Sequence, residues 1–245
     1  PKTTAGGDQW VADDRIGIFM IGNGATSISG NIKESADNIQ YKAKSLSSDG
    51  KTAYFSPVSG TPIYYPVSGD KVDFIAYYPY KATGGSGINN YTYPVDVSTQ
   101  TTPADIDVLY AKATNTGSGY DKNSSTVDLP FSHVLSKLSF TLTSGAGSPD
   151  LSGAKVEISG VATTATMELK DGSLTGKNSN QTITANTATN GLTSSAIMVP
   201  QTLSGTKLLV TLAGNNKYEW TFTTTEWEKG KHYPYTITVD KTGIT

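Results

Sequence analysis

The chain lacks cysteine and contains only two histidines and a single arginine, Arg15, among its 245 residues. Without cysteine, this sequence can form no disulfide, no thiolate zinc site and no cysteine nucleophile. Charged residues make up 16% of the chain, and 19 basic against 21 acidic residues give a net charge of -2. Such a balance gives no long-range attraction to a polyanion, so nucleic acid is not an expected partner.

Long apolar runs are also missing. A membrane-spanning helix needs about 18 or more consecutive apolar residues, and the longest candidate here is the short run IGIFMIG that starts at Ile16. The first residues, PKTTAGGDQW, have neither the charged start nor the apolar core of a signal peptide. If the parent protein is secreted, we therefore expect that its targeting segment was removed from this chain or was never included.

The sequence is rich in residues typical of strands and turns. Residues 16–21 are apolar at every position except Gly17, which predicts a buried central strand. Val72–Tyr78 is the clearest strand of the first half, and Pro79 ends it. Residues 98–107 predict a loop with at most one helical turn. No segment keeps an apolar period of 3.6 residues over three turns, so we expect little helix.

The second half consists of short predicted strands separated by turn residues. The alternation of Leu138, Phe140 and Leu142 with polar residues is typical of a half-buried strand. Short strands at such spacing predict a sandwich or barrel. The predicted strands are 135–142, 155–158, 165–169, 181–184, 195–199, 207–212, 217–222 and 233–239. We place the seam between two β-rich halves at Phe131.

Four segments occur in an order that is harder to produce by chance than any one of them. They are VDFIAYYPY from Val72, DVLYAKA from Asp107, FSHVLSKLSF from Phe131 and EWEKGKHYPYTITVDKTGI from Glu226. In this order the chain resembles the fimbrillin family of Bacteroides-type bacteria, whose members are pilus subunits and pilus-tip adhesins. The resemblance implies an all-β fold of two tandem transthyretin-like Greek-key β-sandwich domains, residues 1–130 and 131–245.

The resemblance also implies a function. The chain is expected to be a structural or adhesive subunit of a cell-surface pilus at the outer membrane, exported as a lipoprotein precursor whose lipid anchor is its sole membrane link. Assembly would follow proteolytic removal of an N-terminal strand and proceed by donor strand exchange with other pilus subunits. A host or bacterial surface ligand, protein or glycan, is the second class of expected partner.

Strand exchange requires an acceptor. A sandwich that lacks one strand leaves a groove with unpaired backbone groups and an exposed core. Because the buried strand lies so near the start, we predict that Ile16, Ile18 and Met20 line this strand-acceptor groove. The family's Trp-x-x-x-Asp element is matched by Trp10 and Asp14. Arg15 follows that element, so cleavage is expected before or near Pro1 and not at Arg15.

No catalytic set is predicted. His133 has Ser132 and Ser136 beside it and Asp128 before it, but these residues lie on or near one strand, with no nucleophile elbow or oxyanion hole. We interpret His133 as a structural residue that hydrogen-bonds a backbone group. His232 is interpreted as a solvated turn residue. The chain is therefore not expected to be an enzyme.

Cofactor and metal sites are not predicted either. Asp13, Asp14, Asp105 and Asp107 could supply oxygen ligands to calcium, but calcium needs six to eight oxygens and no calcium-loop pattern is present. We interpret these carboxylates as solvated loop residues. The glycines around Gly85 lack the lysine and helix of a phosphate-binding loop.

Tyrosine is plentiful, with 14 copies. Most are expected to pack in the core, since tyrosine is a good strand former. Tyr64, Tyr65 and Tyr91 are the candidate surface aromatics, because loop tyrosines can stack on sugar rings or anchor interfaces. They keep open an alternative function, that of a surface glycan-binding lipoprotein without enzymatic activity, which a row of exposed aromatics on one face would favour.

Overall fold

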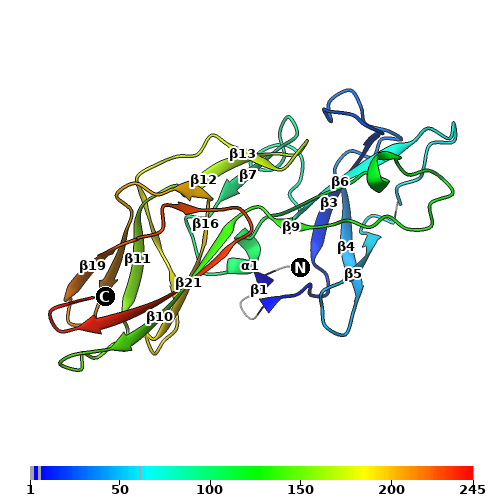
Figure 1. Cartoon of the computed structure of the whole chain (residues 1–245). Coiled ribbons are helices and arrows are strands. Elements are labelled where there is room, and N and C mark those ends of the chain that lie inside the picture. The colour runs from blue at the N-terminus through cyan, green and yellow to red at the C-terminus, as the bar shows by residue number, and fades with distance from the viewer. Residues whose placement is uncertain (1–2, 5–6, 61, 245) are drawn as a thin grey trace. The chain divides into compact units, whose positions relative to one another are not determined.

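The structure is a computed structural model that describes residues 3–4, 7–60 and 62–244 (Figure 1). Its helical elements are α1 (Pro103–Ile106) and one 3-10 turn (Asn115–Gly117), and the other regular elements are strands. The all-β prediction is confirmed, and α1 fits the prediction of at most one helical turn within residues 98–107. Among the described residues, no helix is long and apolar enough to cross a membrane.

Contacts divide the chain into two compact units. Unit 1 holds the described residues up to Val95, together with Asp107–Val134 and Thr166–Thr175. Unit 2 holds Asp96–Ile106, Leu135–Ala165 and the described residues from Gly176 onward. The units are interleaved in sequence. The division into tandem domains at residue 131, and their transthyretin-like topology, stay predictions.

Unit 1 is built on a six-stranded antiparallel sheet (Figure 1). Its strands, in spatial order, are β5 (Ala53–Pro57), β4 (Ile39–Leu46), β3 (Arg15–Gly22), β6 (Val72–Tyr78), β8 (Leu109–Ala113) and β9 (Ser132–His133). A small pair, β1 (Thr3–Thr4) and β2 (Gly7–Asp8), precedes it. Strands β3 and β6 are central, as their apolar sequences predict, because both of their faces are buried.

One face of this sheet packs against a second sheet. Phe19 of β3 and Tyr77 of β6 lie on this face, with Tyr77 5.4 Å from Tyr93 between ring centroids. Tyr93 belongs to β7 (Thr92–Asp96), which forms a three-stranded sheet with β12 (Thr164–Glu168) and β13 (Ser173–Thr175). Gly17 permits this packing, since a Cβ there would lie 2.6 Å from Asn38 Oδ1 and against the Tyr77 ring.

The other face of this sheet is here called the groove face. Ile18, Phe74 and Tyr78 point to this side, and irregular segments supply the covering side chains. These covering residues are Trp10, Ile63, Tyr65, Val127, Leu129 and Phe131. The groove face is therefore half of a sandwich whose second layer is made of irregular chain.

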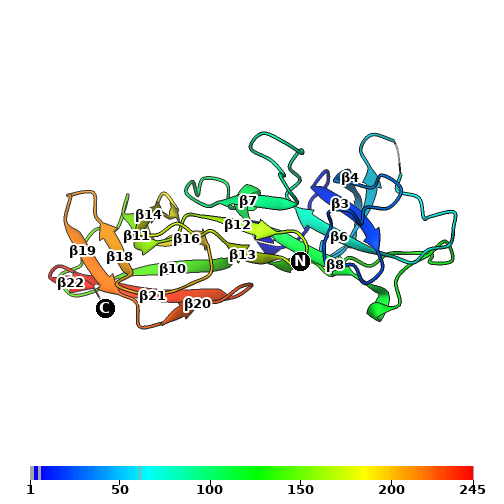
Figure 2. The same cartoon turned by 90° about the horizontal axis from the view of Figure 1, so that it is seen from above.

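Unit 2 contains two main sheets (Figure 2). The five-stranded sheet runs β15 (Asn186–Thr187), β16 (Thr193–Met198), β10 (Ser136–Ser144), β21 (His232–Asp240) and β22 (Gly243–Ile244). The four-stranded sheet runs β14 (Gln181–Thr184), β11 (Lys155–Val161), β18 (Lys207–Thr211) and β19 (Lys217–Thr221), and β17 (Gln201–Thr202) pairs with β20 (Glu226–Trp227). Phe140 of β10 stacks on Tyr235 of β21 at 5.5 Å and lies 6.4 Å from Phe222 after β19. The eight strands predicted for this half all overlap observed strands.

Strand β21 pairs in parallel with β10 over eight residues, but β22 covers only its last two. Two backbone hydrogen bonds, from Lys137 N–H to Lys231 O and from Gly145 N–H to Val239 O, show which residues of β21 direct their backbone groups toward β10. The backbone N–H and C=O groups of odd-numbered residues of β21 therefore point toward β10, and the backbone of Pro234 points toward the outer edge of the sheet. Because proline has no N–H, this edge lacks a donor at its centre, which disfavours pairing with another strand.

Candidate functional site: an apolar groove in unit 1

The groove face carries a hollow of about 650 Å³. Its floor comes from the sheet, with Ile18 of β3, Tyr41 of β4 and Phe55 of β5 pointing into it. Phe74 of β6 completes the floor. The other lining residues are Trp10, Lys51, Thr52, Ala53, Tyr54, Ile63, Tyr65 and residues 126–131. A hollow of this size, lined mostly by apolar side chains, has the character of a binding site.

Trp10 lies at the centre of the aromatic cluster beside this groove. Its ring makes edge contacts with Phe55 at 5.1 Å, Phe131 at 5.2 Å and Tyr78 at 5.7 Å. Asp14 fixes the turn that carries Trp10, because its Oδ2 accepts the Val11 N–H at 2.8 Å. The Trp-x-x-x-Asp element is thus a turn that holds the tryptophan against the groove.

One side of the groove is formed by residues 125–131, here called the groove wall. Along it Val127, Leu129 and Phe131 are half-buried, whereas Thr126, Asp128 and Pro130 are exposed. This alternation is that of a strand. Nevertheless, the described residues give the wall no ladder partner, and its one backbone bond joins Phe131 N–H to Leu129 O. The wall is an extended segment without a sheet.

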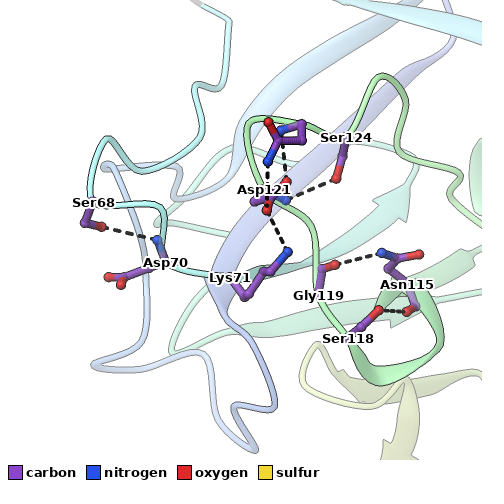
Figure 3. A network of polar contacts seen from close by, with 9 residues as sticks. Ser68, Asp70, Lys71, Asn115, Ser118, Gly119, Asp121 and Ser124 are labelled. Atoms are coloured by element: carbon purple, nitrogen blue, oxygen red, sulfur yellow. Dashed lines mark hydrogen bonds and ion pairs between the residues drawn. The ribbon is translucent and has the colours of Figure 1, made fainter.

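A polar network holds the chain just before the wall (Figure 3). Lys71, directly before β6, donates to Asp121 Oδ2 at 2.6 Å, and the Asn123 N–H donates to Asp121 Oδ1 at 2.9 Å. The Asp121 N–H donates to Ser124 Oγ at 3.1 Å. The hydrogen bond from Lys71, followed by that from Asn123, lowers the pKa of Asp121 below its ordinary value. The network anchors the start of the wall to the sheet.

The far end of the wall is held by β9. His133 of β9 pairs with Leu109 of β8, and its Nδ1 lies 3.1 Å from Asp107 Oδ2. The Asp107 carboxylate is thus within reach of the imidazole, a contact that sequence reasoning did not name, and the predicted backbone partner of His133 stays a prediction. Asp107 is buried, which also corrects its interpretation as a solvated carboxylate. The wall is thus anchored at both ends and unladdered between them.

The groove is also lined by β5, the edge strand of the six-stranded sheet. Val58 N–H donates to Gln40 O, so the next hydrogen-bonded pair along the two strands is Lys42 with Ser56. The backbone nitrogen of Pro57, which lies between these pairs, therefore points toward the free edge of β5. A bulge between Ala43 and Ser45 also disturbs this pair of strands. The β5 edge is therefore a poor template for another strand.

Tyr41 and Tyr65 mark the remaining end of the groove. The Ile63 N–H donates to the Tyr41 hydroxyl at 2.8 Å, and the Tyr65 ring packs edge-on against Phe74 at 6.2 Å. Burial raises the pKa of both tyrosines above the ordinary value. Both are therefore neutral at physiological pH, so they add no charge to the apolar hollow.

The family model described as fimbrillin-like matches residues 3–245. This chain belongs to the fimbrillin-like family. It is 34% identical to a protein of Bacteroides uniformis provisionally named fimbrium subunit Fim1C, over 99% of this chain and 78% of that protein.

Solved structures agree with this membership. A provisionally assigned cell adhesion protein of Bacteroides uniformis is 31% identical, with a TM-score of 0.80 over 99% of this chain and 92% of that one. The tip fimbrial protein Mfa3 of Porphyromonas gingivalis, with a C-terminal truncation, has a TM-score of 0.53 over 95% of this chain and 92% of its own. At 10% identity, the likeness to Mfa3 concerns the fold alone.

The predicted strand-acceptor residues of this fimbrillin-like chain are only partly at the groove. Ile18 lines it, whereas Ile16 and Met20 are fully buried in the core on the same face. Strand β3 pairs with β4 on one side and β6 on the other, so no strand can be added at its edges. That the groove accepts a strand stays a prediction.

The three candidate surface tyrosines do not form one row. Tyr64 is 68% exposed, but Tyr65 packs on Phe74 at the groove face. Tyr91 packs at 5.9 Å on Phe19, which points to the opposite face of the sheet. Since the three rings do not share a face, they give no platform for a sugar chain.

Other sequence interpretations also need correction. His232 is the first residue of β21 rather than a turn residue, and its Nε2 lies 2.8 Å from Ser139 Oγ. Asp14 is buried, not solvated. Among the described residues, no group of three potential ligand side chains could hold a metal ion.

Sequence reasoning missed the groove wall. The signal was available, because TVDLPF from Thr126 alternates polar and apolar residues as a strand does. The pattern was not recognised because it is short and lies between a loop rich in Asn and Ser and the predicted seam at Phe131.

Proposed function

We propose that this chain is a structural or adhesive subunit of a cell-surface pilus, and that its groove receives an extended strand from another subunit. Membership of the fimbrillin-like family supports the first part, since a named relative at 34% identity is a provisional fimbrium subunit. An assembly role of this kind requires no catalysis. The proposal includes export to the cell surface as a lipid-anchored precursor and removal of an N-terminal strand.

The unladdered wall is the observation that carries the second part. Its extended backbone lacks ladder partners among the described residues, and its inward side chains Val127 and Leu129 already pack on the core. A strand laid beside it would pair with the wall and point alternate side chains at Ile18, Tyr41 and Phe55. The β5 edge is less suitable, because the bulge between Ala43 and Ser45 disturbs its pairing with β4.

The size of the groove fits such an occupant. Seven extended residues span roughly 23 Å at 3.3 Å each, and about three of the side chains of a matching strand would point inward. Burying three large apolar side chains contributes roughly 5–9 kcal/mol before the cost of ordering the strand. Several new backbone hydrogen bonds would add to this. The expected complex is long-lived.

The test compares two charges on the wall, in the bacterium that encodes the chain. Leu129→Asp places a carboxylate toward the groove, whereas Ser125→Asp places one at an exposed position of the same segment that does not line the hollow. We expect the first variant to fall about tenfold or more in sheared, detergent-resistant fimbriae, and the second to remain at the wild-type level. Circular dichroism of the purified variants checks that both fold.

A second measurement does not depend on the folding of Leu129→Asp. Val127 is replaced by the photoreactive residue p-benzoylphenylalanine, and fimbriae are irradiated and digested for mass spectrometry. We expect bonds to one segment of another subunit. Wild-type incorporation of folded Leu129→Asp, or bonds from position 127 that stay within its own chain, would overturn the strand-acceptor role.

A further inference from the structure

The chain contains two Asn-Gly pairs, Asn23–Gly24 and Asn190–Gly191. This dipeptide deamidates readily, because glycine has no Cβ to keep its backbone nitrogen away from the asparagine carboxamide. The glycine nitrogen bonds to the asparagine Cγ, and ammonia leaves with the proton of the peptide N–H. Water then opens the succinimide ring to give aspartate or isoaspartate. Both asparagines are exposed, so water reaches both pairs.

The first pair occupies the tight turn that follows β3. The Ala25 N–H donates to Gly22 O at 3.1 Å and closes this turn. Gly24 has a φ of +74°, which the third position of such a turn requires and glycine adopts without strain. The Asn23 N–H donates to Lys71 O at 3.0 Å and ties the turn to the start of β6. The fold therefore imposes a labile dipeptide at this point of unit 1.

One carboxylate, that of Asp73 in β6, holds both reacting groups of this pair. Asp73 Oδ1 accepts a hydrogen bond from Asn23 Nδ2 at 2.8 Å, and its Oδ2 accepts one from the Gly24 N–H at 2.9 Å. Asp73 is 1% exposed, and in the described part of the chain it forms no ion pair with a cation. A buried carboxylate is costly without its hydrogen-bond donors. The leaving amide and the attacking nitrogen are therefore held firmly, here called the Asp73 clamp.

The second pair has the same chemistry but different partners. Asn190 Oδ1 accepts the Leu192 N–H at 3.0 Å, and the Gly191 N–H donates to Ala188 O at 2.8 Å. In the described part of the chain, no carboxylate accepts a hydrogen bond from this pair. Hydrogen bonds to a charged acceptor are stronger than those between neutral groups. The second pair is thus a reference without a clamp, in the same polypeptide.

The Asp73 carboxylate disfavours the reaction and does not assist it. Attack requires the Gly24 nitrogen to lose its proton, and a carboxylate is far too weak a base to remove the proton of a peptide N–H. Negative charge also builds up on the carboxamide oxygen during the attack, and a second negative charge nearby opposes this. The product is disfavoured as well, because an aspartate at position 23 would set two carboxylates against each other.

We propose that Asp73 protects the Asn23–Gly24 pair from deamidation in the folded chain. The Asp73 clamp acts whether or not the groove receives a strand, so it is independent of the proposed function. It preserves the packing of the loop that leads to the groove wall. Asn23 Nδ2 also donates to Gly117 O at 3.4 Å, and a Cβ on Gly119 would lie 2.9 Å from the Asn23 side chain. A carboxylate at position 23 would face this carbonyl without a proton to donate.

The test follows both pairs in the full chain. Wild type and Asp73→Asn are kept in mildly alkaline buffer with and without urea, and mass spectrometry of the digests gives the deamidation rates at Asn23 and Asn190. In the folded wild type, we expect Asn23 to react about tenfold or more slowly than in urea, because hydrogen bonds to a charged group must break first. In folded Asp73→Asn, the rate at Asn23 should rise toward the urea value, whereas the rate at Asn190 should not change.

Two results of this experiment would overturn the proposal. An equal rate at Asn23 in folded and urea-unfolded wild type would show that the clamp gives no protection. A slower rate at Asn23 in folded Asp73→Asn than in folded wild type would show that the carboxylate acts as a base. Circular dichroism of Asp73→Asn checks that the variant is folded.

A second measurement does not depend on the folding of Asp73→Asn. Asn23→Asp reproduces one product of the reaction, and Asn190→Asp is the matched control in the second pair. Asn23→Asp should raise the equilibrium constant for urea unfolding about tenfold or more, because it places a second carboxylate beside buried Asp73. Asn190→Asp should leave this constant nearly unchanged, since a carboxylate can still accept the Leu192 N–H. Equal effects of the two substitutions would contradict the Asp73 clamp.

Discussion

Replacing Trp10 by alanine should destabilise unit 1 strongly. Trp10 is 5% exposed and touches three rings, those of Phe55, Tyr78 and Phe131. Loss of a buried tryptophan costs about 3–5 kcal/mol. Because Trp10 adjoins a hollow of about 650 Å³, water can reach the space that it leaves, which favours the lower end of this range. We expect a loss of about 3 kcal/mol.

The assay is urea unfolding followed by far-UV circular dichroism. Trp10→Phe is the matched control, because it keeps an aromatic ring and should cost about 1 kcal/mol. The chain has three tryptophans, and the other two, Trp220 and Trp227, lie in unit 2. Their emission therefore monitors unit 2 in the same sample. A cost below about 1 kcal/mol for Trp10→Ala would refute the role assigned to this ring cluster.

Two further outcomes follow from particular contacts. The Lys71 hydrogen bond lowers the folded-state pKa of Asp121, so its stabilising effect is complete above the unfolded pKa near 4 and is lost as the pH falls through the folded value. Between about pH 5 and pH 2, the unfolding free energy of the Asp121→Asn variant should therefore fall less than that of the wild type. Chemical unfolding at each pH measures this difference, and parallel curves of unfolding free energy against pH would contradict it. Pro234→Thr restores an N–H at the open edge of β21 and should increase self-association in light scattering, whereas an unchanged monomer would show that this edge is protected in another way.

Strands were predictable wherever sequence period and burial agree. Residues 16–21 and, apart from Asp73, residues 72–78 are largely apolar on both faces, and both segments are central strands. The alternation after Leu138 likewise became β10. In these segments local pattern and tertiary environment demand the same residues, so a single sequence is enough.

The groove could not be predicted in the same way. Its floor combines residues far apart in sequence, such as Ile18 and Phe74, and its wall is a strand-like segment without strand partners. We predicted an acceptor groove at Ile16, Ile18 and Met20 because their strand lies near the start of the chain. Which of these side chains reaches a surface depends instead on the order of the strands in the sheet. The partner of His133 was missed for a similar reason, because Asp107 is 26 residues away.

The parallel pairing of β10 with β21 has a consequence for how unit 2 forms. Lys137 pairs with His232, so the first long strand of this unit must find a mate synthesised almost a hundred residues later. Pairings between such distant segments are slow, because a large loop must close before any contact is gained. Unit 2 thus cannot complete this pairing until nearly all of the described chain has been synthesised.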